Sequence, residues 1–157
     1  MNKTKAVKDF WNEFCLKRSF AEAGEKYQVW NFGSTREMAR ELADLVLSGK
    51  KTATASLPET YETKPDEKPT VGTYSVVTDF DGVPVCVVQT TEVNHVPFNE
   101  VGPEFAFDEG EGDQSLDYWR GVHSEYFSKE AFELGIEFSE NSLICCERFR
   151  LVFPNEL

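Results

Sequence analysis

One change of pattern constrains the fold of this chain more than any other feature. Residues 34–48 carry the pattern of an amphipathic helix, which starts at a capping-box sequence and continues with apolar residues at helical spacing: Met38, Leu42, Leu45 and Val46. Gly49 then offers the left-handed backbone position at which helices commonly end. Residues 52–56 alternate a hydroxyl side chain with alanine, which is the period of a strand. The chain must therefore turn from helix to strand within a few residues.

Two lysines and three hydroxyl groups lie at this helix-to-strand corner. We expect Thr52, Thr54 and Ser56 on one face of the strand, where the small alanines leave room for a ligand. Lys50 and Lys51 follow the negative end of the helix dipole. A lysine there is a solvated partner of the dipole, a charge clamp for an anion or, once buried, a base, and the local chemistry leaves these alternatives open.

Length and composition indicate a single domain, residues 1–157, because 40% of the residues are hydrophobic and 13% are aromatic. No apolar run approaches the ~20 residues that a membrane span needs, and the N-terminus does not resemble a signal peptide, so we expect no membrane association and a cytoplasmic location. The four cysteines lack metal-ligand spacing. We therefore expect free, mostly buried thiols. We also expect no metal and no cofactor.

The charge is strongly acidic, at −12, which opposes generic binding to DNA or to any phosphate backbone. Residues 99–117 hold seven acidic residues and no lysine or arginine. This charge balance is compatible with a small substrate that binds beside a local lysine. It is also compatible with a single-stranded nucleic-acid end that enters one basic groove.

The remaining patterns predict an α+β fold with a mostly antiparallel, barrel-like sheet. In the N-terminal part, the predicted elements are a helix over 4–18, a short strand or extended segment over 27–32, and a loop over 57–71 with a helical turn at 58–61. Two strands follow over 73–80 and 83–93, joined by the two-residue turn Asp81-Gly82. The C-terminal part has turns and short helical pieces over 98–112, a helix from Asp113 or Ser115 to about Phe127, a separate short helix over 128–134, and a strand over 143–153.

Several charged residues have two interpretations. In the acidic turn, the flanking glycines let Glu109 or Glu111 face a ligand or pair with Lys51, although a solvated turn is the plainer alternative; the calcium-loop pattern does not match. Arg120 and His123 either bind an anion together or serve as salt partners of that turn. Glu147 lies alone on an apolar strand face, so it is either ion-paired with an arginine or a site carboxylate.

Four segments together resemble the ASCH domain family from about Trp30 onward: Gly49–Thr54, Gly72–Val77, Glu109–Leu116 with Trp119, Arg120 and His123, and Cys146–Phe149. The resemblance implies a PUA-like, mostly antiparallel β-barrel flanked by helices, with a cleft beside the helix-to-strand corner. It further implies a partner that is a modified nucleoside or single-stranded RNA. Residues 1–30 would then be an N-terminal helical extension packed on the domain.

A small bacterial branch of this family hydrolyses the acetyl amide of N(4)-acetylcytidine without a metal, using a lysine, a threonine and a glutamate. By resemblance these are Lys51, Thr54 and Glu109, and the matching of the glutamate is the loosest. The long N-terminal region and the residue pattern 109–123 fit a larger bacterial subgroup, other members of which have been proposed to bind or cleave RNA. The residues expected to contact substrate are Lys50, Thr52, Trp30, Ser115, Arg120, His123 and Arg148.

The functional alternatives differ in the groups that they use. An RNA-binding module would contact phosphate through lysines and arginines, and would stack a base on Trp30, Phe32 or Tyr61. A metal-free ribonuclease would use Lys51, Ser115 and His123, and a ligand sensor would need no catalytic group. The hydrolase requires Lys51 to lie before the strand or at a bulge, because a regular strand would point Lys51 and Thr54 to opposite faces.

Overall fold

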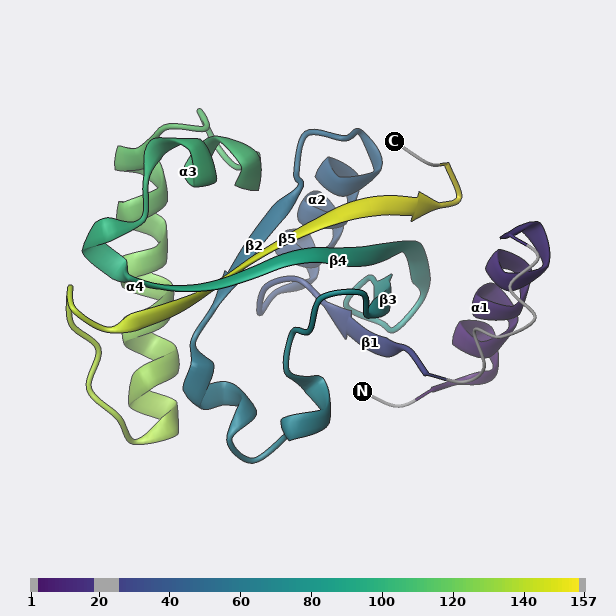
Figure 1. Ribbon diagram of the computed structural model, residues 1–157, viewed down its shortest axis with the longest axis horizontal. Coiled ribbons are helices and arrows are strands. Elements are labelled where there is room, and N and C mark those ends of the chain that lie inside the picture. The colour runs from purple at the N-terminus through teal and green to yellow at the C-terminus, as the bar shows by residue number, and fades with distance from the viewer. Residues whose placement is uncertain (1–2, 19–25, 156–157) are drawn as a thin grey trace.

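The computed structural model describes residues 3–18 and 26–155, and its centre is a five-stranded mixed sheet with the strand order β1-β3-β4-β5-β2. The strands are β1 (Gln28–Asn31), β2 (Ala53–Ser56), β3 (Tyr74–Thr78), β4 (Pro84–Pro97) and β5 (Leu143–Phe153). β1 pairs in parallel with β3, whereas the other three pairings are antiparallel. The long strands β4 and β5 cross most of the molecule and curve, so the sheet forms a half-barrel (Figure 1). The predicted α+β class with a mostly antiparallel sheet is confirmed.

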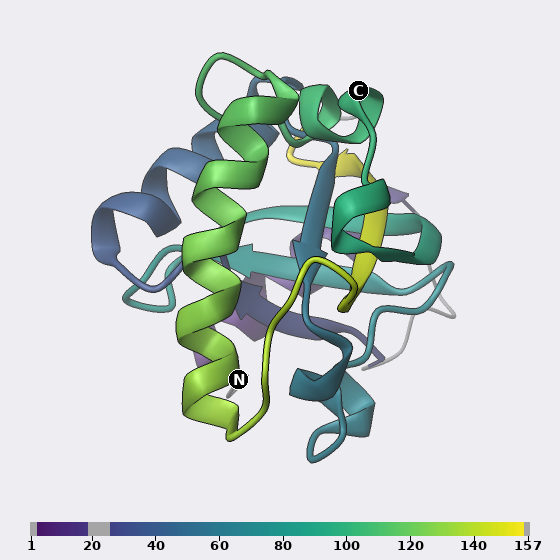
Figure 2. The same cartoon turned by 90° about the vertical axis from the view of Figure 1, so that its left-hand side faces the viewer.

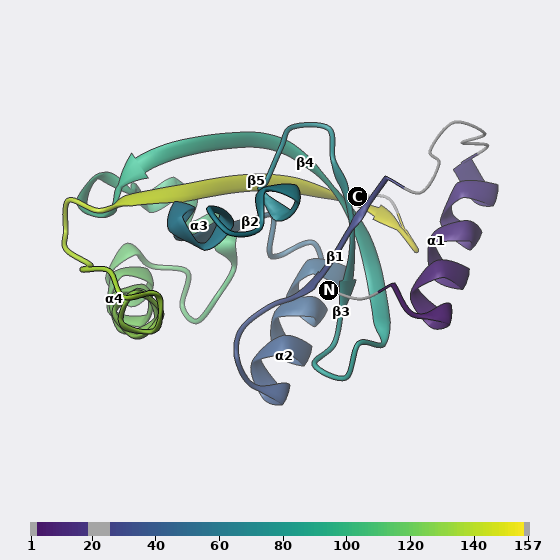
Figure 3. The same cartoon turned by 90° about the horizontal axis from the view of Figure 1, so that it is seen from below.

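In the described part of the chain, four helices surround the sheet: α1 (Lys5–Arg18), α2 (Arg36–Leu47), α3 (Pro103–Glu109) and α4 (Leu116–Leu134). Short 3-10 turns cover Pro58–Tyr61, Pro65–Glu67 and Phe98–Glu100. Helix α1 lies at one end of the molecule and α4 at the other, where it runs past α3 (Figures 1 and 2). Helices α2 and α4 both lie on the concave side of the long strands (Figure 3). Within the described ranges, no helix has the length and apolar character that crossing a membrane requires.

Apolar side chains form three clusters that attach each helix to the sheet. Helix α1 buries Val7, Trp11 and Phe14 against β1, β3, β4 and the end of β5, which confirms the predicted helix. Helix α2 packs on the middle of the sheet, and α3 and α4 pack together over its far end. Because each large apolar side chain contributes about 1.5–3 kcal/mol when buried, these clusters fix the helices relative to the strands.

The boundary between the N-terminal segment and the sheet lies before residue 30. The segment over 27–32, left open between strand and extended chain, contains β1, whose residues pair with β3 from Gln28 onward. Residues 28–30 therefore belong to the sheet. The helical segment that packs on it is α1, residues 5–18.

Two local predictions are wrong. The turn between β3 and β4 has three residues, 80–82, because the Asp79 amide donates to the Val83 carbonyl over 2.9 Å and Gly82 takes a left-handed φ of 82°. The Asp79 carboxylate fixes this turn by accepting from the amides of Asp81 and Val83. Residues 128–134 are not a separate helix either, since the buried pair Phe127 and Ala131 continues the apolar stripe of α4 without interruption.

Candidate functional site

The helix-to-strand corner forms as the sequence predicts. The Thr35 side chain caps α2 by accepting from the Met38 amide, and Gly49 ends the helix with a φ of 81°. The amides of Lys50 and Lys51 then both donate to the Leu45 carbonyl, 3.1 Å away. Because β2 begins only at Ala53, Lys51 lies before the strand and its side chain is not restricted to the strand alternation. The geometric condition for Lys51 and Thr54 to share a site is met.

A second corner, between α3 and α4, packs directly against the first. Gly110 ends α3 with a φ of 74°, and a Cβ atom at this position would lie 2.5 Å from the Lys50 carbonyl oxygen. The Thr52 amide donates to the Asp108 carbonyl over 2.7 Å, which joins the two corners backbone to backbone. Only glycine permits this approach. The contact brings Glu109 and Glu111 next to Lys51.

Lys51 is the centre of the resulting cluster. Its side chain is 1% exposed, and Nζ donates to the Glu109 carbonyl oxygen at 3.2 Å, to Glu109 Oε1 at 3.1 Å and to Glu111 Oε2 at 3.1 Å. The three acceptors match the three N–H donors of an ammonium group. Nζ also lies 5.3 Å from the centre of the Phe32 ring. Of the alternatives for the acidic turn, pairing with Lys51 is confirmed for both carboxylates.

Glu109 is held as a carboxylate on both of its oxygens. Oε1 accepts from Lys51, whereas Oε2 accepts from Trp119 Nε1 and lies 3.2 Å from His123 Nε2. Burial alone would raise the pKa of this group, but Lys51, His123 and the Trp119 donor together lower it to about 2. Glu109 therefore stays ionised, and both of its oxygens are occupied.

His123 has acceptors on both ring nitrogens, since Nδ1 lies 2.9 Å from the Trp119 carbonyl and Nε2 faces Glu109. The ring stacks on Trp119 with centroids 4.3 Å apart. Burial opposes a charge on the imidazole, but Glu109, Glu111 and the carbonyl raise its pKa overall. His123 is thus a partner of the acidic turn, as one of the two interpretations stated.

Glu111 differs from Glu109 in having a single charged partner and more contact with solvent. Its side chain is 14% exposed and it pairs with Lys51 alone among the described residues. Burial and the nearby Glu109 charge raise the pKa of Glu111, although Lys51 opposes the shift. Two neighbouring carboxyl groups therefore have pKa values moved in opposite directions, an arrangement that is typical of acid–base sites.

These residues form one end of a cleft of about 530 Å³. Its walls are β1 with the start of α2 on one side and α4 on the other, and β2 contributes Thr54, Ala55 and Ser56. Aromatic side chains also line it: Trp30, Phe32, Tyr61 and Tyr126. A volume of this size fits a ligand as large as a nucleoside.

Glu147 lines the same cleft and is 6% exposed. The expected arginine partner is wrong, because Glu147 Oε2 instead accepts from Thr90 Oγ1 at 2.6 Å. Burial raises the pKa of Glu147 and the Thr90 hydroxyl only partly offsets this effect. The interpretation of Glu147 as an ion-pair partner of an arginine is thus not supported among the described residues.

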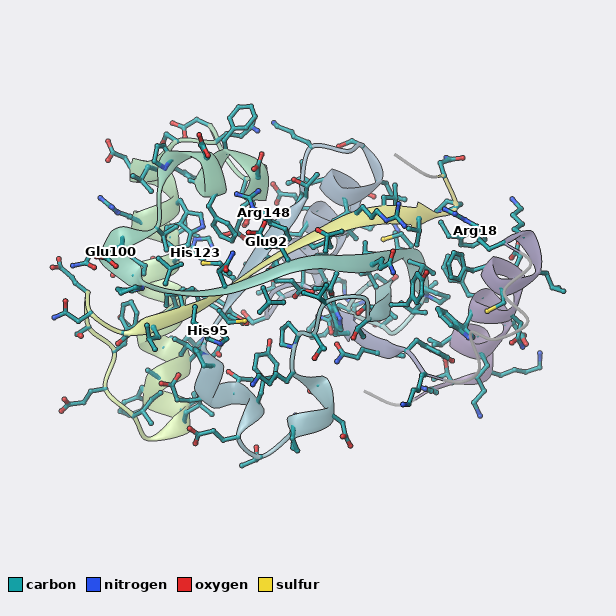
Figure 4. The ribbon with its side chains drawn as sticks, viewed as in Figure 1. Arg18, Glu92, His95, Glu100, His123 and Arg148 are labelled. Carbon is teal, nitrogen blue, oxygen red and sulfur yellow. The ribbon has the colours of Figure 1, made fainter. Side chains whose placement is uncertain are left out.

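Five of the expected substrate-contacting residues lie outside the lining of the cleft: Lys50, Thr52, Ser115, Arg120 and Arg148. Ser115 caps α4 by accepting from the Tyr118 amide, and Arg120 donates to the carbonyl of Asn99. Arg148 pairs with Asp108 and Glu92, and it lies beside Glu92 in Figure 4, apart from His123. Thus Arg120 and His123 do not converge. Trp30 and His123, in contrast, line the cleft together with Lys51, Thr54 and Glu109.

Trp119 carries part of the family resemblance, but the sequence did not predict its hydrogen bond to Glu109. A buried indole N–H needs an acceptor, so a tryptophan four residues before a histidine was a usable signal. The contributions of Tyr126 and Glu130 to the wall had no such signal, because they depend on how α4 faces β2.

Glu109, Glu111 and His123 also offer three potential metal-ligand atoms, which lie within 4.8 Å of one another. The ammonium of Lys51 already lies against both carboxylates, at 3.1 Å from each. A cation entering this group would face that charge, and both oxygens of Glu109 are already engaged. The donor set therefore fits an internal ion-pair network better than a metal.

Comparisons with known proteins agree with this geometry. The ASCH domain family matches residues 28–153. A crystal structure of an ASCH domain from Lactobacillus crispatus is 38% identical, with a TM-score of 0.85 over 95% of each chain. A protein from Enterococcus faecalis is 34% identical, with a TM-score of 0.83 over 94% of this chain and 88% of that one. A hypothetical protein that is 15% identical, with a TM-score of 0.54 over 80% of this chain and 100% of that one, supports the fold alone. Among curated proteins there is no match. The half-barrel is the PUA-like fold of the ASCH structures, and this chain belongs to the ASCH domain family.

Proposed function

We propose that the cleft binds a modified nucleoside and that the protein hydrolyses an amide on its base, with N(4)-acetylcytidine as the model substrate. The observation that carries this proposal is that Lys51 and Thr54 line one cleft although they lie three positions apart across the start of β2. A hydroxyl that can act as a nucleophile, a cationic nitrogen and a carboxyl group of raised pKa therefore line the same cleft.

The charge of the cleft favours a nucleoside over an RNA strand. Among the described residues, six glutamates line it, against two lysines. A phosphate backbone would be repelled by such walls, and Lys50, Arg120 and Arg148, which an RNA strand would need, lie outside them. The flat faces of Trp30 and Tyr126 suit a base, at about 1–3 kcal/mol per stacked ring.

In the proposed reaction, the Thr54 hydroxyl or a water held by it attacks the acetyl carbonyl. Lys51 takes up the proton of the attacking group after it has passed one of its own to Glu111. The carbon–nitrogen bond then breaks, and the exocyclic nitrogen receives a proton from Glu111 and leaves as the amino group of cytidine. If water attacks, acetic acid is released at this step; if Thr54 attacks, a water molecule must then hydrolyse the acetyl–threonine ester. Either route consumes one water molecule, returns Lys51 and Glu111 to their starting protonation states, and releases the proton of acetic acid to solvent as acetate forms.

The two carboxyl groups of the acidic turn would have separate tasks. The family resemblance selects Glu109 as the glutamate of the reaction, but this carboxylate is ionised and faces three donors, so we assign it to holding Lys51 in place. Burial raises the pKa of Glu111 and its side chain lines the cleft, and both properties suit a group that exchanges a proton with the substrate.

The test is turnover of N(4)-acetylcytidine, followed by loss of its ultraviolet absorption band. We expect Lys51→Met and Thr54→Val to lower kcat/KM at least about a hundredfold, in line with the loss of an acid–base or nucleophilic group. Glu111→Gln should lower kcat/KM more than Glu109→Gln does, when both rates are corrected for the fraction of protein that is folded. Lys8→Met and Thr91→Val, which alter exposed positions on α1 and β4, serve as matched controls.

Two results would count against the hydrolase. Turnover that survives Thr54→Val and Lys51→Met would place the chemistry elsewhere. No turnover at high enzyme concentration would leave a cleft that binds without catalysis; RNA affinity that falls steeply with salt would then favour an RNA-binding module over a nucleoside sensor.

A further inference from the structure

One buried carboxylate in the cleft takes no part in the proposed reaction. Glu147 lies on β5 directly opposite Thr54 of β2 in the antiparallel register. Side chains of directly opposed residues project from the same face of a sheet, with Cβ atoms about 4.5–5.5 Å apart. The Glu147 carboxyl group is therefore adjacent to the hydroxyl that we assign to the attack, and both groups line the cleft.

The described surroundings of Glu147 leave it incompletely paired. One oxygen, Oε2, accepts from the neutral Thr90 hydroxyl, and no lysine, arginine or histidine among the described residues forms an ion pair with Glu147. A buried carboxyl group without a cation normally costs stability unless further hydrogen bonds satisfy it. Burial accordingly raises the pKa of Glu147. A role in accepting a hydrogen bond from a bound ligand explains the Glu147 carboxyl group better than a structural role does.

We propose that Glu147 is a specificity residue that accepts a hydrogen bond from the exocyclic N–H of the bound base. This inference rests on the proposed function, because it takes the ligand of the cleft to be a nucleoside. In a secondary amide such as N(4)-acetylcytidine, the N–H is attached to the carbonyl carbon that Thr54 would attack. Opposed positions on β2 and β5 thus match adjacent atoms of the substrate.

The ligand class follows from the acceptor. Glu147 selects bases with an N–H donor at the exocyclic position, which are amino bases and their mono-acylated forms. It disfavours uracil, whose carbonyl oxygen at the same position would face an acceptor. A site built around a buried hydrogen-bonding group rejects the ligand that lacks the partner group, since the protein group is then left unpaired.

The experiment compares the binding of cytidine with that of uridine by isothermal titration calorimetry, a readout that does not need turnover. For the wild-type protein we expect cytidine to bind at least about tenfold more tightly than uridine. In Glu147→Leu, which places an apolar side chain at this buried position and removes the acceptor, the preference for cytidine should fall to within about twofold. Glu147→Gln retains an acceptor oxygen and should keep part of the preference. Glu137→Gln, at an exposed position after α4, is the matched control.

Turnover measured on the same proteins separates the two proposals. A Glu147→Leu protein that still prefers cytidine tenfold would overturn the inference while leaving the hydrolase intact. If the wild-type protein prefers cytidine but does not turn over N(4)-acetylcytidine, and Glu147→Leu abolishes the preference, the inference is supported and the hydrolase proposal is wrong. If the wild-type protein binds both nucleosides alike, or neither of them, Glu147 does not read the base. Thermal unfolding of each variant checks that it is folded.

Discussion

Replacing Lys51 with methionine should destabilise the folded protein by about 3–5 kcal/mol, the loss typical of removing one partner of a buried ion pair. Methionine keeps an unbranched chain of similar length, so the apolar contacts of the lysine stem are largely preserved. What is removed is the ammonium group that accounts for one contact on Glu111 and two on Glu109.

The size of the effect follows from the burial of the groups left behind. The Glu109 side chain is 2% exposed and that of Glu111 14%, so water cannot replace the lost donor on Glu109. The two like charges would also face each other without a cation between them. For a domain of this length, about 2–4 °C of Tm corresponds to each kcal/mol, which predicts a fall in Tm of roughly 6–20 °C.

Thermal unfolding followed by circular dichroism at neutral pH measures this fall. Lys8→Met on the exposed face of α1 is the control and should shift Tm little. In the double variant Lys51→Met/Glu109→Gln the buried charge is removed together with its partner, so the loss should be smaller than the sum of the single losses. A Lys51→Met protein that loses less than about 1 kcal/mol would contradict this prediction, and so would a double variant in which the two single losses simply add.

Two further predictions concern the surroundings of Lys51. Gly110→Ala should destabilise the protein by at least about 1–3 kcal/mol, because the position has a left-handed φ and the added Cβ atom would meet the Lys50 carbonyl. Gly121→Ala in α4 is the control and should be neutral or stabilising, because a Cβ atom there meets nothing within 4 Å. Equal Tm values for the two variants would contradict this prediction. Folding raises the pKa of His123, so protonation of His123 stabilises the folded state fully at pH values below the ordinary pKa of 6.5. This stabilisation is lost as the pH rises through the higher pKa of the folded state. His123→Gln keeps a donor but does not titrate, so it should flatten the dependence of Tm on pH between these two pKa values.

The elements that the sequence predicts well are those whose signals are local. Gly49, the Thr35 cap and the apolar stripes of α1 and α2 place these helices without reference to the rest of the chain. The same is true of the long strand β5, whose pattern is regular over 11 residues. The turn before β4 was predicted one residue too short because its length depends on the Asp79 carboxylate, which a dipeptide signal does not include.

The site is predicted only in part, because it depends on contacts between distant corners. Lys51, Thr54 and Glu109 were selected by resemblance and do line one cleft. Arg120 and Arg148 were expected to contact substrate, but both bind acceptors of the protein itself. The distinction between Glu109 and Glu111 follows from Trp119 and His123, two residues of α4 that reach only one of the two carboxylates through hydrogen bonds. No spacing rule in a single sequence carries that information.

The most direct test of the central claim is a crystal structure of the Thr54→Val protein with N(4)-acetylcytidine. We predict that the intact nucleoside lies in the cleft between β1 and α4, with its acetyl carbonyl carbon beside residue 54 and within reach of Lys51, and with its exocyclic N–H donating to Glu147. A nucleoside bound outside this cleft, or bound within it with the acetyl group pointing away from Lys51, would contradict the proposed function.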